Sequence, residues 1–368
     1  MRFLVLLCVL LSSCRVGYVI SSSYYQMELL AKRKKNTKVL EKNQLPAAEA
    51  EKLKLIPKMK SFGKKLGLSS TDNYDTIALE LDRTVWNVSG CDPLSFTSAS
   101  WWFPVVGRIT YLGFFTDRAA ERWMKRLKKK NLDVYQRTAG AYSTLGWFRD
   151  PVWPSMLKWD EYELAEVVFH ELTHATLWVK GGASFNESFA NFVGQQAMYA
   201  YMEDKYGRDS KEVAETRRDY RDQDKLVVIL HQLYKDVDAV FQDKSLSKEA
   251  KLKKKQEVYD SIGARILASD IEQKERYAKA LQRNPWNNAR LMQFKTYNTS
   301  EEDFAAILQQ QNGDIKALID EVGRITKKQK KPFVAIKRAA DKIRAALPAS
   351  APSSQPATHP TTTPRPAD

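Results

Sequence analysis

Two histidines four residues apart, with a glutamate directly after the first, constrain this chain more than any other feature. His170-Glu171-Leu172-Thr173-His174 lies in a segment whose apolar residues, such as Leu164 and Val168, recur at helical spacing. Residues four apart share one face of a helix, so both imidazoles can point at one ion while Glu171 reaches a water beside it. The segment therefore predicts a helix that presents a metal site. The alternative is a buried helix with two hydrogen-bonded histidines.

A catalytic zinc site needs a third protein ligand and leaves its fourth position to water. Glu187 is the best candidate, because Gly181-Gly182 predicts a tight turn into an antiparallel helix that begins near Ser184. The alternative is a capping box, in which Glu187 bonds back to the start of its own helix. His231 is the other ordered candidate, although its surroundings suit a core or surface histidine. We expect one Zn²⁺ per chain, held by the two motif histidines and Glu187.

The residues around this motif resemble a known family. Phe185-Asn186-Glu187-Ser188-Phe189-Ala190 resembles the Asn-Glu-x-Phe-Ala signature of zinc aminopeptidases of the gluzincin type. The wider chain is similar to a bacterial family of predicted lipoprotein aminopeptidases, and the likeness rests on residues 102–104, 141–151, 169–174, 185–190 and 287–289. The resemblance implies a zinc metallopeptidase that acts as an aminopeptidase. The expected fold is α+β and predominantly helical, with a zincin-like core that combines a small sheet, the motif helix and an antiparallel helix bearing Glu187.

The resemblance and the residue chemistry together suggest a division of roles. Glu171 acts as general base: it takes a proton from a zinc-activated water that attacks a peptide carbonyl, and then passes the proton to the leaving amine. A tyrosine often stabilises the oxyanion in gluzincins, and Tyr297 is the first candidate here, ahead of Tyr142. Either residue, taken singly, also fits an ordinary packed tyrosine. Asn191, four residues after Glu187, could accept a hydrogen bond from a ligand histidine.

Substrate contacts are expected just before the motif helix. An extended strand there could pair with the backbone of a peptide, and its central residues are Ala141, Tyr142 and Ser143. An aminopeptidase must also bind a free ammonium group, for which a carboxylate is suited. Asp150, Glu161 and Glu163 are available, and the sequence does not select among them.

The first residues are typical of an exported lipoprotein. The apolar run Phe3–Leu11 is too short to span a bilayer and leads into Leu11-Ser12-Ser13-Cys14, which resembles a bacterial lipobox. The resemblance implies cleavage before Cys14 and a lipid anchor on its thiol, and the alternative is an ordinary signal peptide with a chance cysteine. We expect a protein anchored in the bacterial cell envelope. Arg15, rather than aspartate, follows the cysteine, which favours the outer membrane facing the periplasm. Cys91 would then be the only other cysteine of the mature chain, and no disulfide is expected.

The formal net charge of +15 has three interpretations. Most of the lysines are expected on solvated helix faces. Some could attract anionic lipid headgroups near the anchor. Nucleic acid is not expected as a partner, because the lysines are spread along helices and an exported protein rarely meets it. The expected partners are therefore a peptide substrate and a membrane, and the sequence does not indicate an oligomeric state.

The chain divides into segments of different character. We expect a signal peptide at residues 1–13, a membrane-proximal helical segment at 14–66, a zincin-like catalytic core at 67–208, a charged helical hairpin at 209–283 that turns near Ser245, a C-terminal helical part at 284–347 that completes the site, and a disordered Pro/Thr/Ser-rich tail at 348–368. Within these segments we expect helices at residues 24–42, 47–66 with a break near Pro57, 76–85, 117–130, 160–180, 184–201, 300–310, 313–326 and 332–346. Strands are expected at 101–111, 132–135 and 139–148.

Two other functions remain open from the sequence. The zinc site could be structural, closed by four protein ligands and without a role for Glu171. The protein could also be a lipid-anchored envelope scaffold that binds partners or lipid through the basic hairpin at 211–283. A zinc peptidase is the leading hypothesis because a structural site has no use for a glutamate at position 171.

Overall fold

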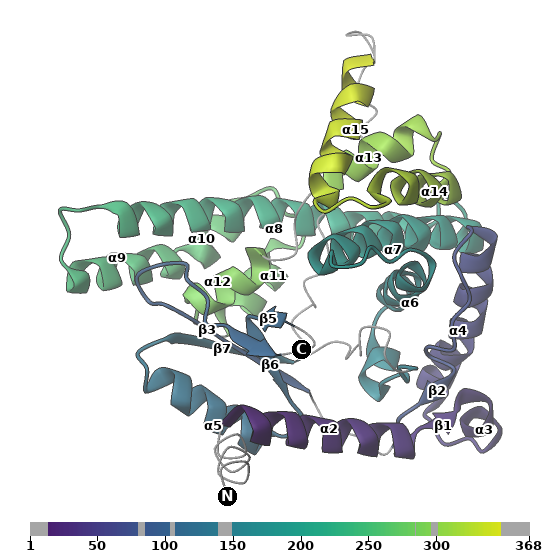
Figure 1. The fold of residues 1–368 in the computed structure, drawn as a ribbon, viewed down its shortest axis with the longest axis horizontal. Helices are drawn as coiled ribbons and strands as arrows, with labels where there is room; N and C mark the ends of the chain where they lie inside the picture. The colour runs from purple at the N-terminus through teal and green to yellow at the C-terminus, as the bar shows by residue number, and fades with distance from the viewer. Residues whose placement is uncertain are drawn as a thin grey trace, which may run out of the picture.

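Helices form most of the chain, as the apolar spacing predicts, and the strands form small sheets among them (Figure 1). The computed structural model describes residues 14–79, 85–103, 107–138, 149–283, 285–295 and 301–346. The helices are α2 (Cys14–Lys32), α3 (Asn36–Glu41), α4 (Ala47–Lys65), α5 (Asp117–Lys128), α6 (Glu161–Thr176), α7 (Ala183–Tyr206), α8 (Lys211–Gln242), α9 (Lys248–Asp260), α10 (Ile262–Leu267), α11 (Lys274–Gln282), α12 (Asn288–Lys295), α13 (Glu301–Gln310), α14 (Ile315–Thr326) and α15 (Pro332–Ala346), with a short 3₁₀ turn at Pro154–Lys158.

The strands are short and form three separate sheets. They are β1 (Lys34–Lys35), β2 (Thr76–Ile77), β3 (Trp86–Cys91), β4 (Trp101–Phe103), β5 (Gly107–Ile109), β6 (Tyr111–Phe114) and β7 (Asp133–Thr138). The largest sheet has the antiparallel order β6-β3-β7, with Val88 opposite Leu112 on one side and Gln136 on the other. Helix α5 packs Ala120 and Leu127 into the apolar cluster that also contains these strands.

The structure corrects three expectations about the sheet region. The expected single strand at 101–111 is an antiparallel hairpin of β4 and β5, followed by β6. Strand β3, the centre of the largest sheet, was not expected at all. The helix expected at 76–85 is wrong in its described part, since Thr76 and Ile77 pair with β1 and Val152 bridges Ile77. Ile77 is fully buried by this pairing, so its helical spacing was a coincidence.

Among the N-terminal helices, α4 packs against α6. The single helix expected at 24–42 is divided at Arg33, because Asn36 ties the chain to the turn at Tyr74 through its side chain, at 2.7 Å. Helix α4 continues through Pro57 and buries Leu53, Ile56 and Met59 in the main core. In the part of the chain that the structure describes, none of the helices combines the length and apolar character needed to cross a bilayer.

The hairpin and the C-terminal helices agree with the sequence pattern. The chain turns after α8 and returns along it as α9–α11. Apolar side chains between these helices form a buried cluster that includes Leu230, Leu233 and Ile266. The return arm is three helices rather than one, and Ser247 caps the first of them by accepting a hydrogen bond from the Ala250 N–H. Helices α13–α15 form a small group that lies over α7 at the other end of the molecule (Figure 1).

Candidate active site

The site is built on two helices that pack closely, α6 and α7. Helix α6 begins at the expected position, where the Asp160 N–H donates to the Glu163 carboxylate at 2.9 Å. It ends at Thr176, earlier than Gly181-Gly182 suggested, and a short connection leads to α7. Asn186 fixes this connection: its Oδ1 accepts from the Val179 N–H and its Nδ2 donates to the Val179 carbonyl, both at 2.9 Å. The residue after it is Glu187.

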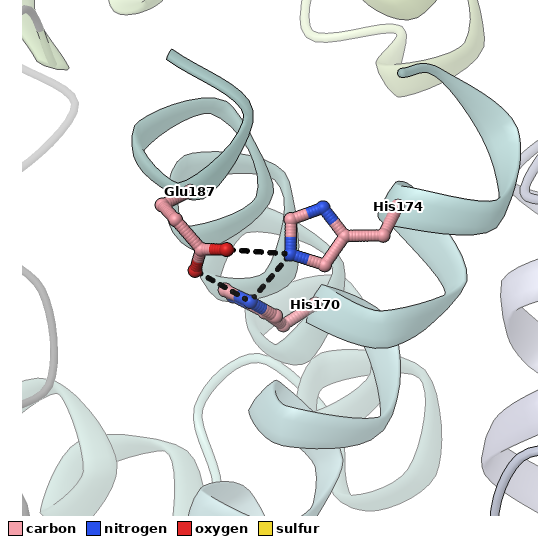
Figure 2. Close-up of side chains that lie close together, drawn as sticks. All are labelled: His170, His174 and Glu187. Carbon is pink, nitrogen blue, oxygen red and sulfur yellow. Dashed lines mark hydrogen bonds and ion pairs between the residues drawn. The ribbon is translucent and has the colours of Figure 1, made fainter. Parts of the chain in front are cut away.

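His170, His174 and Glu187 converge from these two helices (Figure 2). The two Nε2 atoms lie 3.0 Å apart, and each lies 3.5 Å from one oxygen of the Glu187 carboxylate. Among the described residues, they make up the group of three candidate ligands whose donor atoms all lie within 4.8 Å of one another. Ligands at 2.0–2.1 Å from a tetrahedral zinc ion lie about 3.3 Å from each other. The spacing and the donor types therefore fit zinc.

Charge and burial agree with this grouping. Burial raises the pKa of Glu187, but hydrogen bonds and charge from His170 and His174 outweigh it and hold that pKa well below the ordinary value. Burial lowers the pKa of His170, while the Glu187 carboxylate reverses the effect and raises it. Helix α7 begins without a side-chain cap, so Glu187 is engaged with the histidines rather than with the start of its own helix.

A glycine allows the two helices to come this close. A Cβ atom at Gly194 would lie 3.0 Å from the Glu166 carbonyl oxygen and 3.1 Å from the His170 nitrogen, so the backbone of α7 rests directly on α6 there. Any side chain at this position would push the helices apart at the level of His170. No pattern in the sequence predicts this role of Gly194.

Glu171 lies on the buried side of α6 and is 6% exposed. Burial raises the pKa of Glu171, the charges of His170 and His174 lower it, and Asp150 and Glu187 raise it again, with a net increase. A carboxylate whose pKa is raised by burial is a better proton acceptor than one in water. Glu171 therefore has the environment of a general base.

Asp150 is the one acid of the three ammonium candidates whose charge raises the pKa of Glu171. Glu161 instead accepts hydrogen bonds from Lys205 at 2.6 Å and from two tyrosines, and Glu163 accepts from the Asp160 N–H.

Asp150 is buried, and its backbone carbonyl accepts a hydrogen bond from the Tyr74 N–H at 2.7 Å. Tyr74 has a φ of +63°, an uncommon value for a bulky residue. Its pKa is raised well above the ordinary value by burial and then by the charges of Glu171 and Asp150.

Two further residues flank the histidines, and sequence reasoning missed both. Glu166, one turn before His170, is buried and accepts a hydrogen bond of 2.5 Å from the Tyr220 hydroxyl of α8. Trp178 lies beside the His174 ring, 5.3 Å between centroids, and is 46% exposed. An exposed indole next to these candidate metal ligands is suited to contact a substrate side chain. The contact of Glu166 with Tyr220 has no local signal, because it depends on how α6 packs against α8. Trp178 lies four residues after His174, and this spacing is the signal that could have indicated its contact.

The remaining expected site residues are placed as follows. Asn191 is buried on α7. Nδ1 of His174 has no hydrogen-bond partner in the described part of the chain, and a bond from His170 to Asn191 stays a prediction. His231 is exposed on α8 and is not in the three-residue group. Ala141, Tyr142, Ser143 and Tyr297 lie outside the described residues, and their expected roles stay predictions.

Comparison with known proteins agrees with the chemistry of this site. A family model, Aminopep, described as "Putative aminopeptidase", matches residues 17–333, which include both histidines, Glu171 and Glu187. Comparison with curated proteins and with solved structures found no match. Because the family model covers most of the sequence, the chain belongs to the Aminopep family.

Proposed function

We propose that this protein is a zinc-dependent peptidase that removes N-terminal residues from peptides at the bacterial cell envelope. The observation that carries the proposal is the convergence of His170, His174 and Glu187, with Glu171 buried next to them. Two neutral imidazoles and one carboxylate are the ligands of known catalytic zinc sites, which keep one position open. The family description supports the peptidase activity and the free-amine specificity.

The residues of this chain divide the work in the proposed reaction. His170, His174 and Glu187 would hold the zinc ion, which would supply Lewis-acid activation of a water molecule and of the substrate carbonyl. Glu171 accepts a proton from the attacking water at a carboxylate oxygen and returns it to the nitrogen of the leaving amine. Asp150 is our candidate for binding the ammonium group of the substrate, because its negative charge lies within electrostatic reach of Glu171. Trp178 contacts the side chain of the first substrate residue.

The location in the envelope is also a proposal. It rests on the lipobox-like residues that end in Cys14 and on the apolar run before them. A diacylglycerol on the Cys14 thiol would hold the protein at a membrane surface without a spanning helix.

Hydrolysis of paired peptides tests the activity. The purified protein and its Glu171→Gln variant are compared on free-amine and N-blocked forms of the same peptides, and zinc is measured in both proteins. We expect cleavage of the free-amine forms, and a loss of at least about 100-fold in kcat with full zinc content in the variant. If both proteins hold one zinc ion and neither cleaves any peptide, the site is structural and the alternative of a lipid-anchored scaffold takes its place.

A further inference from the structure

Helix α2 is apolar on two opposite sides. Its inner side packs on the protein: the Tyr18 hydroxyl accepts from the Gly113 N–H at 3.2 Å, Tyr25 stacks on Phe115, and Leu29 is 1% exposed. These residues recur at the spacing of one helix face. An amphipathic helix at the surface of a soluble protein would carry polar residues on the other side.

The outer side of α2 instead carries large apolar side chains. Val19, Ile20, Tyr24 and Met27 are 46%, 59%, 65% and 61% exposed. The last three follow the i, i+4, i+7 pattern and form one stripe. Among the described residues, eleven large apolar side chains are exposed, and four of them fall within nine residues of this one helix. Single exposed apolar residues are ordinary, but a continuous stripe indicates a surface that meets an apolar partner.

Basic side chains lie near both ends of α2. Helix α5 lies next to the N-terminal part of α2 (Figure 1), and Phe114 contacts Tyr18 of α2 and Trp123 of α5. The exposed side of α5 and the turn after it carry Arg118, Arg122, Lys125, Arg126, Lys128, Lys129 and Lys130. Beyond the C-terminal end of α2, the exposed cations are Lys35, Lys38 and Lys42.

We propose that the outer stripe of α2 and the basic side chains beside it dock on an anionic lipid bilayer. Apolar residues on one face and cations at its borders are the two features of helices that lie in a membrane interface. The proposed lipidation site agrees, since Cys14 is the first residue of α2 and would hold this helix at the membrane surface. A second copy of the chain is a poorer occupant, because a symmetric contact through this face would bring the two sets of cations together.

The inference is independent of catalysis and adds a second contact with the membrane to the proposed diacylglycerol on Cys14. A helix laid flat on the bilayer would also fix the orientation of the whole protein towards the membrane. The bilayer is recognised by the negative charge of its headgroups and by its apolar acyl region, and no particular headgroup is required.

Hydroxyl-radical footprinting of the full chain tests the docking face. The protein is mixed with vesicles of phosphatidylcholine containing roughly one-third phosphatidylglycerol, and oxidation is read by mass spectrometry. We expect oxidation of Tyr24 and Met27 to fall at least about threefold on these vesicles, while Trp178 is unchanged. Equal oxidation of α2 with and without vesicles would overturn the proposal.

Vesicle binding by variants distinguishes the contribution of this face from that of the lipid anchor. A chain that begins at residue 14 with Cys14→Ser keeps every contact between described residues and carries no lipid. Adding Ile20→Asp and Met27→Asp should weaken its binding to the same vesicles at least about tenfold. Val228→Asp, at a residue 68% exposed on α8, is the matched control and should have no effect. Arg122→Glu with Lys125→Glu should weaken binding to anionic vesicles only.

Two results would count against the proposal, and neither depends on the peptidase activity. Binding that survives the paired aspartates would show that another surface holds the lipid. Concentration-dependent dimerisation that the aspartates abolish, without vesicle binding, would assign the stripe to a contact between copies. Zinc content and hydrolysis of soluble peptides should be the same in all these variants, which confirms that each is folded.

Discussion

Asn186 holds the backbone of Val179 from both sides, accepting from its N–H and donating to its carbonyl, each at 2.9 Å. This pair closes the connection between α6 and α7 directly before Glu187. We expect Asn186→Ala to lower the free energy of unfolding by about 1–2 kcal/mol, because two partly buried backbone groups lose their partners. The position of Glu187 would loosen as well, so zinc affinity should fall at least about tenfold. Chemical denaturation and competition with a zinc-binding dye measure the two effects.

Asn288→Ala is the control for that prediction. Asn288 is also fully buried and donates to two backbone carbonyls, those of Asp92 and Ser95, in the hairpin side of the molecule. We expect a comparable loss of stability and an unchanged zinc affinity. Equal zinc affinities in Asn186→Ala and the parent protein would show that the connection does not position Glu187.

Gly194→Ala should damage the site although no polar group is removed. Its Cβ would meet two backbone atoms of α6 at 3.0 and 3.1 Å, and backbone cannot move aside as a flexible side chain can. We expect a loss of about 1–3 kcal/mol in unfolding free energy and weaker zinc binding. Gly17→Ala on α2, where a Cβ meets nothing within 4 Å, should be neutral or stabilising. If Gly194→Ala binds zinc as tightly as the parent, the close approach of the helices is not required.

Local spacing was sufficient to predict the helices of the site. The four-residue interval of His170 and His174 places them on one face, and the Gly-Gly turn suggested that Glu187 would return to that face. Apolar residues that recur at helical spacing also predicted the hairpin and the three C-terminal helices. These features are determined by residues close in the sequence, which is why the pattern alone was informative.

The rest depends on contacts between distant segments. Strand β3 has polar and glycine residues, Asn87, Ser89 and Gly90, and becomes a strand because β6 and β7 pair with it on both sides. The turn at Tyr74 is held by the carbonyl of Asp150 and the amide of Asn36. Similarly, the partner of Glu166 comes from α8. No pattern within one segment could predict such pairs.

The buried acid Glu166 should make stability depend on pH. Burial raises the pKa of Glu166 to about 7, although the hydrogen bond from Tyr220 opposes the increase. A carboxyl group whose pKa is higher in the folded than in the unfolded chain stabilises the folded state below about pH 4.5. This contribution is lost as the pH rises towards 7. We expect the unfolding free energy of chelator-treated protein to fall by up to about 3 kcal/mol between pH 5 and pH 8.

Substitution identifies the group responsible for that fall. Glu166→Gln stays neutral and can still accept the hydrogen bond from Tyr220, so the decline with pH should become shallower. Glu121→Gln, at an exposed position on α5, should leave it unchanged. The same slope in the parent protein and Glu166→Gln would mean that another group causes the dependence.

Asp150→Asn tests how the substrate amine is bound. The substitution keeps the size of the side chain and removes the negative charge that lies near Glu171. We expect KM for free-amine peptides to rise at least about tenfold, since a charge-assisted contact is lost, while KM for N-blocked forms is unchanged. Glu161→Gln, at the outer end of α6, should affect neither. A drop in kcat alone, with KM constant, would argue that Asp150 acts only by tuning Glu171.

Phe304→Ala tests whether the C-terminal helices support the site. Phe304 is fully buried on α13, and its ring contacts Phe185 and Phe189, which lie two residues before and after Glu187. The substitution should cost about 3–5 kcal/mol through the cavity it leaves. Because the cavity opens under the first turns of α7, zinc affinity should fall together with stability. Leu233→Ala, equally buried but in the hairpin cluster, should lower stability without changing zinc affinity. Equal zinc affinities in the two variants would limit the C-terminal helices to a general role in folding, whereas a loss confined to Phe304→Ala would make them part of the structure that holds Glu187 in place.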